Sequence, residues 1–425
     1  MQRIFLKASN FFQIVLFLGL AAGLCGCGAK PLPRYSPPPR EPDASLQPLS
    51  ANATIDTAAP PTTAYGELVM TQNVQGEKEA IYHLKKGEAL YSAVVVRFTG
   101  RIEADEVNSF AQYLMQYNGI RDATRIPAGT PIRIPVRFLD EDMLREGKPA
   151  PIKTPAKQPT RRGNGLHVIL DAGHGGNDPG TIVRSWSEDE IAYDLALRIK
   201  RGLEAKSVEV FLTVEDKDTG ESVPSGRTLV NNRHEYVKVT PAYYMDDSRV
   251  ALNMRIYLIE DIYRNLVQRG VSSDRVIFIS IHLDYLHPSV GGAMVYFPAA
   301  NERLSQFRAA GDIYQKYKES QVGGIYFSQN ENDNAELMSY QFAQNLIQTF
   351  RHSGIPVHDY QPIRRYVYRQ DQKWSPGIIR YSRVPTSILL EAANLSHQDD
   401  WTRIRTAGFR QKLADAVVRT ILAQR

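Results

Sequence analysis

Three apolar runs of this chain each lead to a side chain that can bind a metal ion or carry a proton. The runs LHVILDAGHGG, VIFISIHLD and PTSILLEAAN contain His174, His282 and Glu391 at or near their ends. Each run is short and rich in β-branched and aliphatic residues, which is typical of strands buried on both faces of a parallel sheet. In open α/β sheets, ligands bind beyond the carboxyl ends of the strands. We therefore expect two imidazoles and a carboxylate to converge at one edge of a sheet.

Helical patterns alternate with these predicted strands. From Ile191 to Leu203, aliphatic residues recur at every fourth position, which places them on one face of a helix that packs on the sheet. A comparable helical pattern is found in residues 252–266, 338–350 and 413–421. The alternation predicts an α/β fold for residues 166–425, with a mostly parallel twisted sheet and helices on both of its faces.

The start of the chain is typical of an export signal, with a basic beginning and an apolar stretch too short to span a bilayer comfortably. It closes with Leu24-Cys25-Gly26-Cys27, which resembles the lipobox of bacterial lipoproteins, where cleavage exposes a cysteine that then carries lipid. Cys27 fits this role better than Cys25, because a small residue precedes Cys27 and a bulky one precedes Cys25. Gly28 is not the aspartate associated with retention at the inner membrane. We expect lipidation at Cys27 and a place in the cell envelope, on the outer membrane and facing the periplasm.

Two segments rich in proline divide the rest of the chain. Residues 28–78 have no periodic apolar pattern and are expected to form an extended tether. A second break separates a small unit from the large C-terminal one. The predicted boundaries are 1–27 for the signal, 28–78 for the tether, 79–138 for the small unit, 139–165 for a linker and 166–425 for the large unit.

The small unit is predicted to be an α+β domain that opens with a strand, turn and helix and closes with a helix, turn and strand. It resembles the LysM module, which binds peptidoglycan. The matching positions are Tyr82, Gly87, Leu90, Asn118, Gly129, Ile132, Ile134 and Pro135. The match has two departures, because the stretch 97–116 is longer than the module normally carries and Glu88 replaces a typical aspartate. A capping domain without a ligand is the alternative.

The large unit resembles the zinc-dependent N-acetylmuramoyl-L-alanine amidases of the third amidase family. The shared patterns are DAGHGG at 171–176, a glutamate that opens the next helix, SIHLD at 280–284 and LLE at 389–391. The glycines around the histidine of the first pattern allow a ligand to approach the turn closely. The chain departs from the family at two positions that are not ligands, with Thr213-Val214 in place of Thr-Arg and Ala393-Asn394 in place of Gly-Phe.

The resemblance implies which residues form the site. His174, Glu188 and His282 are the implied zinc ligands, and Glu391 is the implied catalytic carboxylate. Glu190 is the competing choice for the ligand on this helix. Aligning Ala196 and Leu197 with the helix of the family favours Glu188. For Glu391, a buried salt bridge is the structural alternative to catalysis.

The chemistry accounts for these residue types. Two neutral imidazoles and a carboxylate leave the fourth position of a tetrahedral zinc ion open, as in hydrolytic sites. Such zinc lowers the pKa of water to about 7 and polarises a carbonyl. Glu391 would accept a proton from the attacking water and return one to the departing amine.

The resemblance also implies the reaction, which is hydrolysis of the amide between the lactyl group of N-acetylmuramic acid and L-alanine of the peptidoglycan stem peptide. The alternatives are a non-catalytic peptidoglycan-binding lipoprotein and a zinc hydrolase that cuts another bond of the stem peptide.

Residues 215–249 and 299–333 look like insertions relative to the compact family core. They could form walls of a substrate groove, with Tyr236, Tyr243 and Tyr244 stacking on sugar, or they could be plain surface loops. A third interpretation is a cover over the zinc that a protein activator displaces, since some relatives are regulated in that way.

The net charge of +5 comes from scattered lysines and arginines without a dense basic helix, which argues against nucleic acid as a partner. The expected partners are peptidoglycan, the membrane through a lipid on Cys27, and a protein activator.

Overall fold

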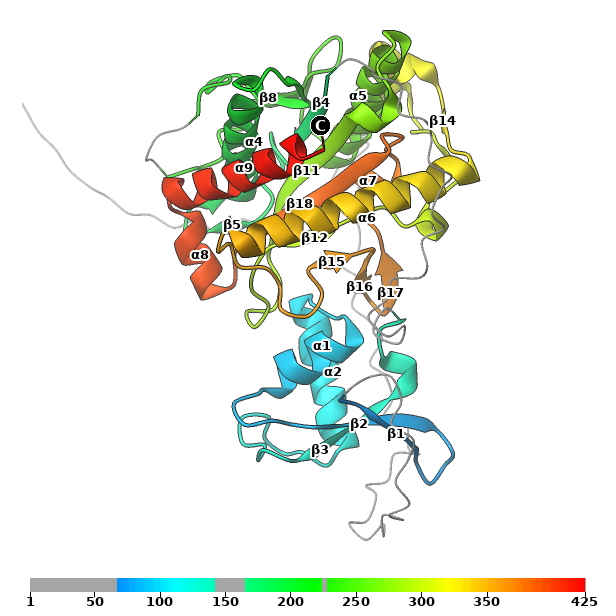
Figure 1. The fold of residues 1–425 in the computed structure, drawn as a ribbon, viewed down its shortest axis with the longest axis vertical. Helices are drawn as coiled ribbons and strands as arrows, with labels where there is room; N and C mark the ends of the chain where they lie inside the picture. The colour runs from blue at the N-terminus through cyan, green and yellow to red at the C-terminus, as the bar shows by residue number, and fades with distance from the viewer. Residues whose placement is uncertain (1–66, 142–164, 224–227, 425) are drawn as a thin grey trace, which may run out of the picture. The chain divides into compact units, whose positions relative to one another are not determined.

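A computed structural model describes residues 67–141, 165–223 and 228–424 of the chain (Figure 1). The predicted signal, its lipidation site Cys27 and most of the tether and linker lie outside the described residues. Within the described ranges, no helix is both long and apolar enough to cross a membrane.

The small unit contains an antiparallel sheet and two main helical segments. The strands pair in the order β1-β2-β3, and Val69 lies opposite Ile81. The elements are β1 (Val69–Gln72), β2 (Lys78–His83), η1 (Leu90–Val96), α1 (Arg97–Thr99), α2 (Ala104–Tyr117), β3 (Pro131–Pro135) and η2 (Val136–Phe138). From β2 to β3 the order is strand, helix, helix, strand, as predicted. The tether boundary at residue 78 is wrong, because the sheet already begins at Val69; β1 is a short edge strand, only partly buried, and leaves no clear apolar pattern.

The large unit is built on a six-stranded sheet with the order β15-β12-β18-β11-β4-β7. Its strands are β4 (His167–Ala172), β7 (Glu209–Leu212), β11 (Val276–Asp284), β12 (Met294–Tyr296), β15 (Ile363–Arg364) and β18 (Thr386–Asn394). Strands β7, β4, β11 and β18 run parallel to one another, while β12 is antiparallel to β18 and parallel to β15. The prediction of a mostly parallel sheet is confirmed.

Helices cover both faces of this sheet. Alternate residues of the central strands point to opposite sides: Val168 and Leu170 belong to one hydrophobic cluster, and Ile169 belongs to the other. The cluster of Val168 includes residues of α4 (Glu188–Glu204), α6 (Gln329–His352) and α9 (Ala407–Leu422), and the cluster of Ile169 includes residues of α5 (Ser248–Gln268). Figure 1 shows α6 and α9 crossing the sheet on one side. Helices on both faces were predicted, and this is confirmed. Two shorter helices are α7 (Gly377–Arg380) and α8 (Gln398–Ile404).

The two segments expected to be insertions both contain strands. Residues 215–249 contribute to a small antiparallel sheet of β8 (Val214–Asp216), β9 (Glu235–Val237) and β10 (Tyr243–Tyr244). Residues 299–333 contain β13 (Gln306–Phe307), β14 (Ile325–Tyr326) and the turns η4 (Ala300–Glu302), η5 (Asp312–Lys316) and η6 (Glu319–Val322), and they pack on α5, where Tyr257 contacts the rings of Phe307 and Tyr314. The remaining elements are β5 (Ile182–Val183), β6 (Trp186–Ser187), η3 (Ser273–Arg275), β16 (Val367–Arg369) and β17 (Gln372–Trp374). Neither segment is therefore a plain surface loop.

Candidate metal and catalytic site

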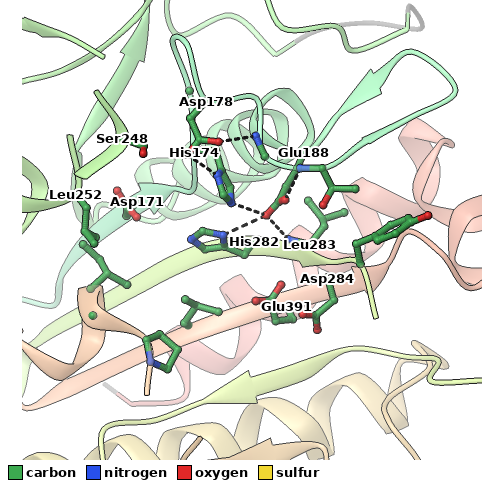
Figure 2. A pocket seen from close by; sticks show the side chains of 18 of the residues that line it. Asp171, His174, Asp178, Glu188, Ser248, Leu252, His282, Leu283, Asp284 and Glu391 are labelled. Atoms are coloured by element: carbon green, nitrogen blue, oxygen red, sulfur yellow. Dashed lines mark hydrogen bonds and ion pairs between the residues drawn. The ribbon is translucent and has the colours of Figure 1, made fainter. Parts of the chain in front are cut away.

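The carboxyl ends of β4, β11 and β18 meet at one edge of the sheet and bring distant residues together (Figure 2). His174 lies in the turn after β4, and His282 lies near the end of β11. Glu391 is the direct neighbour of His282 on the adjacent strand β18. Glu188 is the first residue of α4, which follows the His174 turn. The structure thus places all four predicted site residues at the edge where parallel strands end.

Three of these side chains point toward a common centre. The Nε2 atom of His174 and the Nδ1 atom of His282 lie 3.2 Å and 3.1 Å from Oε1 of Glu188. Donor atoms of the three residues all lie within 4.8 Å of one another. Ligand atoms of a tetrahedral zinc ion lie about 3.3 Å apart, given zinc–ligand distances of about 2.0–2.1 Å. The donor types and their spacing therefore fit zinc.

Charge and burial explain why this cluster favours a cation at its centre. Burial alone would raise the pKa of Glu188, but the two imidazoles outweigh burial and hold its pKa well below the ordinary value. Burial would lower the pKa of His174, and the carboxylates of Glu188 and Asp178 outweigh it, raising the pKa to about 10. Because Glu188 stays ionised and favours positive charge on His174, a divalent cation could take the place of the proton on that ring.

Asp178 orients His174 from outside the cluster. Its Oδ2 atom lies 3.1 Å from Nδ1 of His174, on the side of the ring that faces away from Glu188. A carboxylate at this nitrogen favours the neutral tautomer that leaves Nε2 free as a ligand. In the same way, the backbone N–H groups of Thr181 and Leu283 donate to the two carboxylate oxygens of Glu188, at 2.9 Å and 3.2 Å.

The backbone of the DAGHGG turn is constrained by close contacts. A methyl group on Gly173 would overlap the imidazole ring of His282, so only glycine fits there. His174 itself has a φ of 61°, in the left-handed region that few non-glycine residues adopt. Arg255 donates to the backbone carbonyl of His174 and lies 3.5 Å from Oδ1 of Asp171. These contacts fix the direction in which His174 points.

Glu391 lies beside the cluster with one free oxygen. Its Oε2 atom is buried and has no hydrogen-bond partner, and among the described residues it forms no ion pair, which argues against the salt-bridge alternative. Burial, followed by the nearby carboxylates of Asp284 and Glu188, raises its pKa well above the ordinary value. The Oδ2 atom of Asp284 is likewise buried without a partner. An unpaired carboxyl group next to a cation site is suited to proton transfer.

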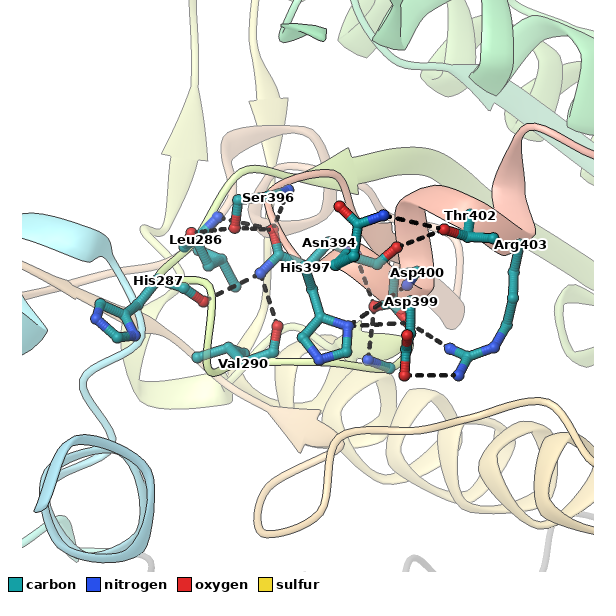
Figure 3. Close-up of polar contacts among 12 residues, drawn as sticks. Leu286, His287, Val290, Asn394, Ser396, His397, Asp399, Asp400, Thr402 and Arg403 are labelled. Carbon is teal, nitrogen blue, oxygen red and sulfur yellow. Dashed lines mark hydrogen bonds and ion pairs between the residues drawn. The ribbon is translucent and has the colours of Figure 1, made fainter. Parts of the chain in front are cut away.

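The end of β18 is held by a network centred on Asn394 (Figure 3). The side chain of Asn394 accepts a hydrogen bond from the Leu286 backbone and donates to the carbonyls of His287 and Val290, at 3.0, 3.2 and 2.7 Å. Asp400 accepts from the backbone N–H of Asn394 at 3.1 Å. This residue, at which the chain departs from the family pattern, therefore joins the loop after β11 to β18 and fixes the two strands that carry His282 and Glu391.

The positions of Glu190 and of the tyrosines in 215–249 decide two alternatives that the sequence left open. Glu190 does not join the histidines; its carboxylate lies in a separate group with Asp216 and Glu235. Tyr243 is buried against Tyr317, so the alternative in which its ring stacks on sugar does not hold for this residue. Tyr244, by contrast, is exposed, and its ring lies 5.7 Å from that of Tyr236.

The site opens into a pocket of about 770 Å³ that contains all four predicted site residues. Sequence reasoning missed several of its neighbours, namely Asp178, Arg255, Asp284 and Trp374. Asp284 lies inside the SIHLD pattern and Asp178 follows the DAGHGG pattern by two residues, so their proximity to the histidines in sequence was the available signal. No sequence pattern points to Arg255 or Trp374. Among the described residues, none from 299–333 lines this pocket.

Comparison with known proteins gives the family context. A family model described as N-acetylmuramoyl-L-alanine amidase matches residues 168–423. The amidase AmiC of Neisseria meningitidis serogroup B is 24% identical over 265 residues, which cover 61% of this chain and 53% of that protein. The chain thus spans about half the length of this relative.

Solved structures of amidases are also similar. AmiC2 of Nostoc punctiforme has 18% identity, covers 61% of this chain and 96% of its own, and gives a TM-score of 0.36. The CwlD amidase of Clostridioides difficile, solved with the GerS lipoprotein, has 19% identity, covers 61% of this chain and 98% of its own, and gives a TM-score of 0.36.

Proposed function

The chain belongs to the N-acetylmuramoyl-L-alanine amidase family, and from this membership and its site we propose that it hydrolyses the amide between N-acetylmuramic acid and L-alanine of peptidoglycan. The observation that carries the proposal is the grouping of His174, Glu188 and His282 within 4.8 Å, with the unpaired carboxyl group of Glu391 beside them. The donor set is that of a hydrolytic zinc site, with three protein ligands and one open position.

Zinc held by His174, Glu188 and His282 would supply an activated water and polarise the scissile carbonyl. The chain's own residues would do the remaining work. Burial and neighbouring carboxylates raise the pKa of Glu391, which keeps a proton available for the departing amine. The ionised form, which accepts the proton of the attacking water, is favoured when positive charge lies nearby. Asp178 would keep the ring of His174 oriented throughout.

Binding to the polymer would be shared with the small unit, which we propose is a LysM-like module. Its arrangement from β2 to β3 supports this, and Asn118 has a structural part in it, since its side chain accepts from the backbone of Arg133 at 2.7 Å and donates to the carbonyl of Leu114 at 2.8 Å. Asn118 therefore joins α2 to β3. A variant lacking residues 67–138 should sediment less with peptidoglycan, whereas equal sedimentation would remove this part of the proposal.

We also propose that a lipid on Cys27 anchors the protein in the cell envelope, at the outer membrane and facing the periplasm. The lipobox-like residues Leu24 to Cys27 support this. Mass spectrometry of the mature N-terminus should find a lipidated cysteine, and an unmodified Cys27 would contradict the proposal. A protein activator stays a prediction, to be tested by comparing the activity of the purified chain alone with that in an envelope extract.

Digestion of purified peptidoglycan tests the catalytic proposal. We expect the zinc-loaded protein to release free peptides that begin with L-alanine, and Glu391→Gln to lower this rate by about 10²- to 10⁴-fold while zinc remains bound. Glu204→Gln is the matched control, because Glu204 is exposed at the far end of α4 and pairs only with Lys200 among the described residues. Fragments from another bond would indicate a different hydrolase, and sedimentation without products would indicate a binding protein. Full activity of Glu391→Gln would refute its assigned role.

A further inference from the structure

A second group of carboxylates lies outside the catalytic site described above. Glu190, Asp216 and Glu235 each offer a carboxylate oxygen, and these atoms lie within 4.8 Å of one another. The three residues are only 6%, 0% and 4% exposed. Acidic groups are common on protein surfaces, but three buried ones in contact need a reason, because burial of like charges is costly.

The three carboxylates come from three different elements. Glu190 lies in the first turn of α4, next but one to the proposed ligand Glu188. Asp216 and Glu235 lie directly opposite each other on β8 and β9, in the segment expected to be an insertion. The cluster is therefore formed where the inserted sheet packs on α4.

Hydrogen bonds satisfy only part of this cluster. Asp216 accepts from the backbone of Asp218 at 2.8 Å and from the side chain of Asn232 at 3.0 Å. Glu235 accepts from the backbone N–H of Gly176 at 2.8 Å. The Oε1 atom of Glu190 is buried and has no hydrogen-bond partner. A buried carboxylate oxygen without a donor is available to bind a cation.

No basic side chain neutralises the cluster within the described residues, where none of the three forms an ion pair. The charged neighbours of Glu190 within the cluster are the carboxylates of Asp216 and Glu235, and Asp189 precedes it on the helix. Carboxylates gathered without a basic partner form the environment that a multivalent cation stabilises.

We propose that Glu190, Asp216 and Glu235 bind a second divalent cation of the hard, oxygen-preferring class, with Ca²⁺ as the best fit. All of the donors are oxygens, whereas the catalytic cluster offers two imidazoles. Ca²⁺ accepts oxygen ligands in flexible geometry, whereas Mg²⁺ demands a near-ideal octahedron, so carboxylates supplied by three different elements suit Ca²⁺ better.

Such an ion would join the inserted sheet to the two elements that carry proposed zinc ligands. Glu235 holds the N–H of Gly176 in the turn of His174, and Glu190 lies in the same helical turn as Glu188. Met245, at the end of the insertion, also accepts from the backbone of Asn177 at 3.0 Å. The cation would therefore stabilise the turn that carries His174, as a positioning site and not as a catalytic one.

Calcium binding to the full chain tests the proposal. The protein is first loaded with zinc and freed of other cations by dialysis, and then titrated with CaCl₂ by calorimetry and with Tb³⁺ by tyrosine-sensitised luminescence. We expect one Ca²⁺ per chain at or below millimolar concentration, as well as a higher Tm in Ca²⁺. His282→Ala should bind Ca²⁺ as the wild type does, because His282 belongs only to the other cluster.

Variants localise the ion. Asp216→Asn combined with Glu235→Gln should bind no Ca²⁺ at these concentrations, and Glu190→Gln should bind it at least about tenfold more weakly. Glu215→Gln is the matched control on the same strand, since Glu215 pairs with Lys238 instead and should leave Ca²⁺ binding unchanged. If the double variant fails to fold, Glu190→Gln decides, because it keeps the bond between Glu235 and Gly176. The proposal is overturned if the wild type binds no Ca²⁺, if Glu190→Gln binds it as the wild type does, or if His282→Ala abolishes binding.

Discussion

The first turn of α4 supplies one carboxylate to each of two clusters with opposite electrostatics. Glu188 meets two imidazoles and has a pKa held well below its ordinary value, whereas Glu190 meets two carboxylates and has a pKa raised to about 8. Both side chains are almost fully buried. Burial is therefore common to the two, and the partners decide whether each residue is ionised. Among the described residues, Glu188 thus has positively charged partners, whereas Glu190 has none.

The largest expected effect, on zinc content and on peptidoglycan hydrolysis, comes from replacing Glu188 and Glu190 by glutamine one at a time. Glu188→Gln removes the only anionic member of the histidine cluster, so we expect loss of bound zinc and of detectable peptidoglycan hydrolysis. Glu190→Gln removes one of several repelling charges, so the zinc content should stay the same. Metal analysis and the digestion assay check both variants. Equal zinc content in the two would remove the distinction between the clusters.

A third buried carboxylate, Asp194, is neutralised by basic side chains, unlike the carboxylate of Glu190. Asp194, on the same helix, pairs with Arg198 at 2.8 Å and with Arg410 at 2.6 Å, and all three are buried. Asp194→Asn would remove the buried counter-ion of Arg410 and the ion pair with Arg198, which we expect to cost about 3–5 kcal/mol of unfolding free energy. Glu204→Gln, at an exposed pair, should cost less than about 1 kcal/mol. Urea denaturation measures both, and similar losses would contradict this account.

The contrast between the clusters also explains what the sequence could predict. The strand that precedes His174 and the strands that carry His282 and Glu391 have continuous apolar patterns, and the rule that parallel strands end at one edge places these residues together. The Glu190 cluster has no such rule behind it. It depends on the pairing of Asp216 with Glu235 across an insertion whose strands are only three residues long. Strand β1 was missed for the same reason, since three partly buried residues and an exposed one have no readable period.

The pH dependence of folding stability also distinguishes the Glu190 cluster from the histidine cluster. In the folded, calcium-free chain the pKa of Glu190 is about 8, against 4.5 for the free side chain, so between these values the folded state holds more protons than the unfolded state. Stability therefore falls as pH rises through this window, by about 3 kcal/mol over the part of it above pH 6. Urea denaturation at pH 6 and pH 8.5 checks this. Glu190→Gln should show a smaller decline, and added Ca²⁺ should reduce the decline in the wild type; an identical decline in Glu190→Gln would contradict the assignment.

The smallest expected effect is on zinc affinity in variants of Asp178, which separate the charge of this residue from its hydrogen bond to His174. Asp178 lies 3.1 Å from Nδ1 of His174 and is about two-fifths exposed, so solvent screens part of its charge. Asp178→Asn keeps an oxygen that can accept from Nδ1 but removes the negative charge, and we expect zinc affinity to fall by about tenfold, the lower end for such outer partners. Asp178→Ala removes the acceptor as well, and should approach a hundredfold. Competition with a zinc chelator measures both. Asp178→Asn keeps the hydrogen-bond acceptor and loses only the charge. If both variants lose zinc affinity equally, the acceptor contributes nothing, and the effect of Asp178 comes from its charge alone.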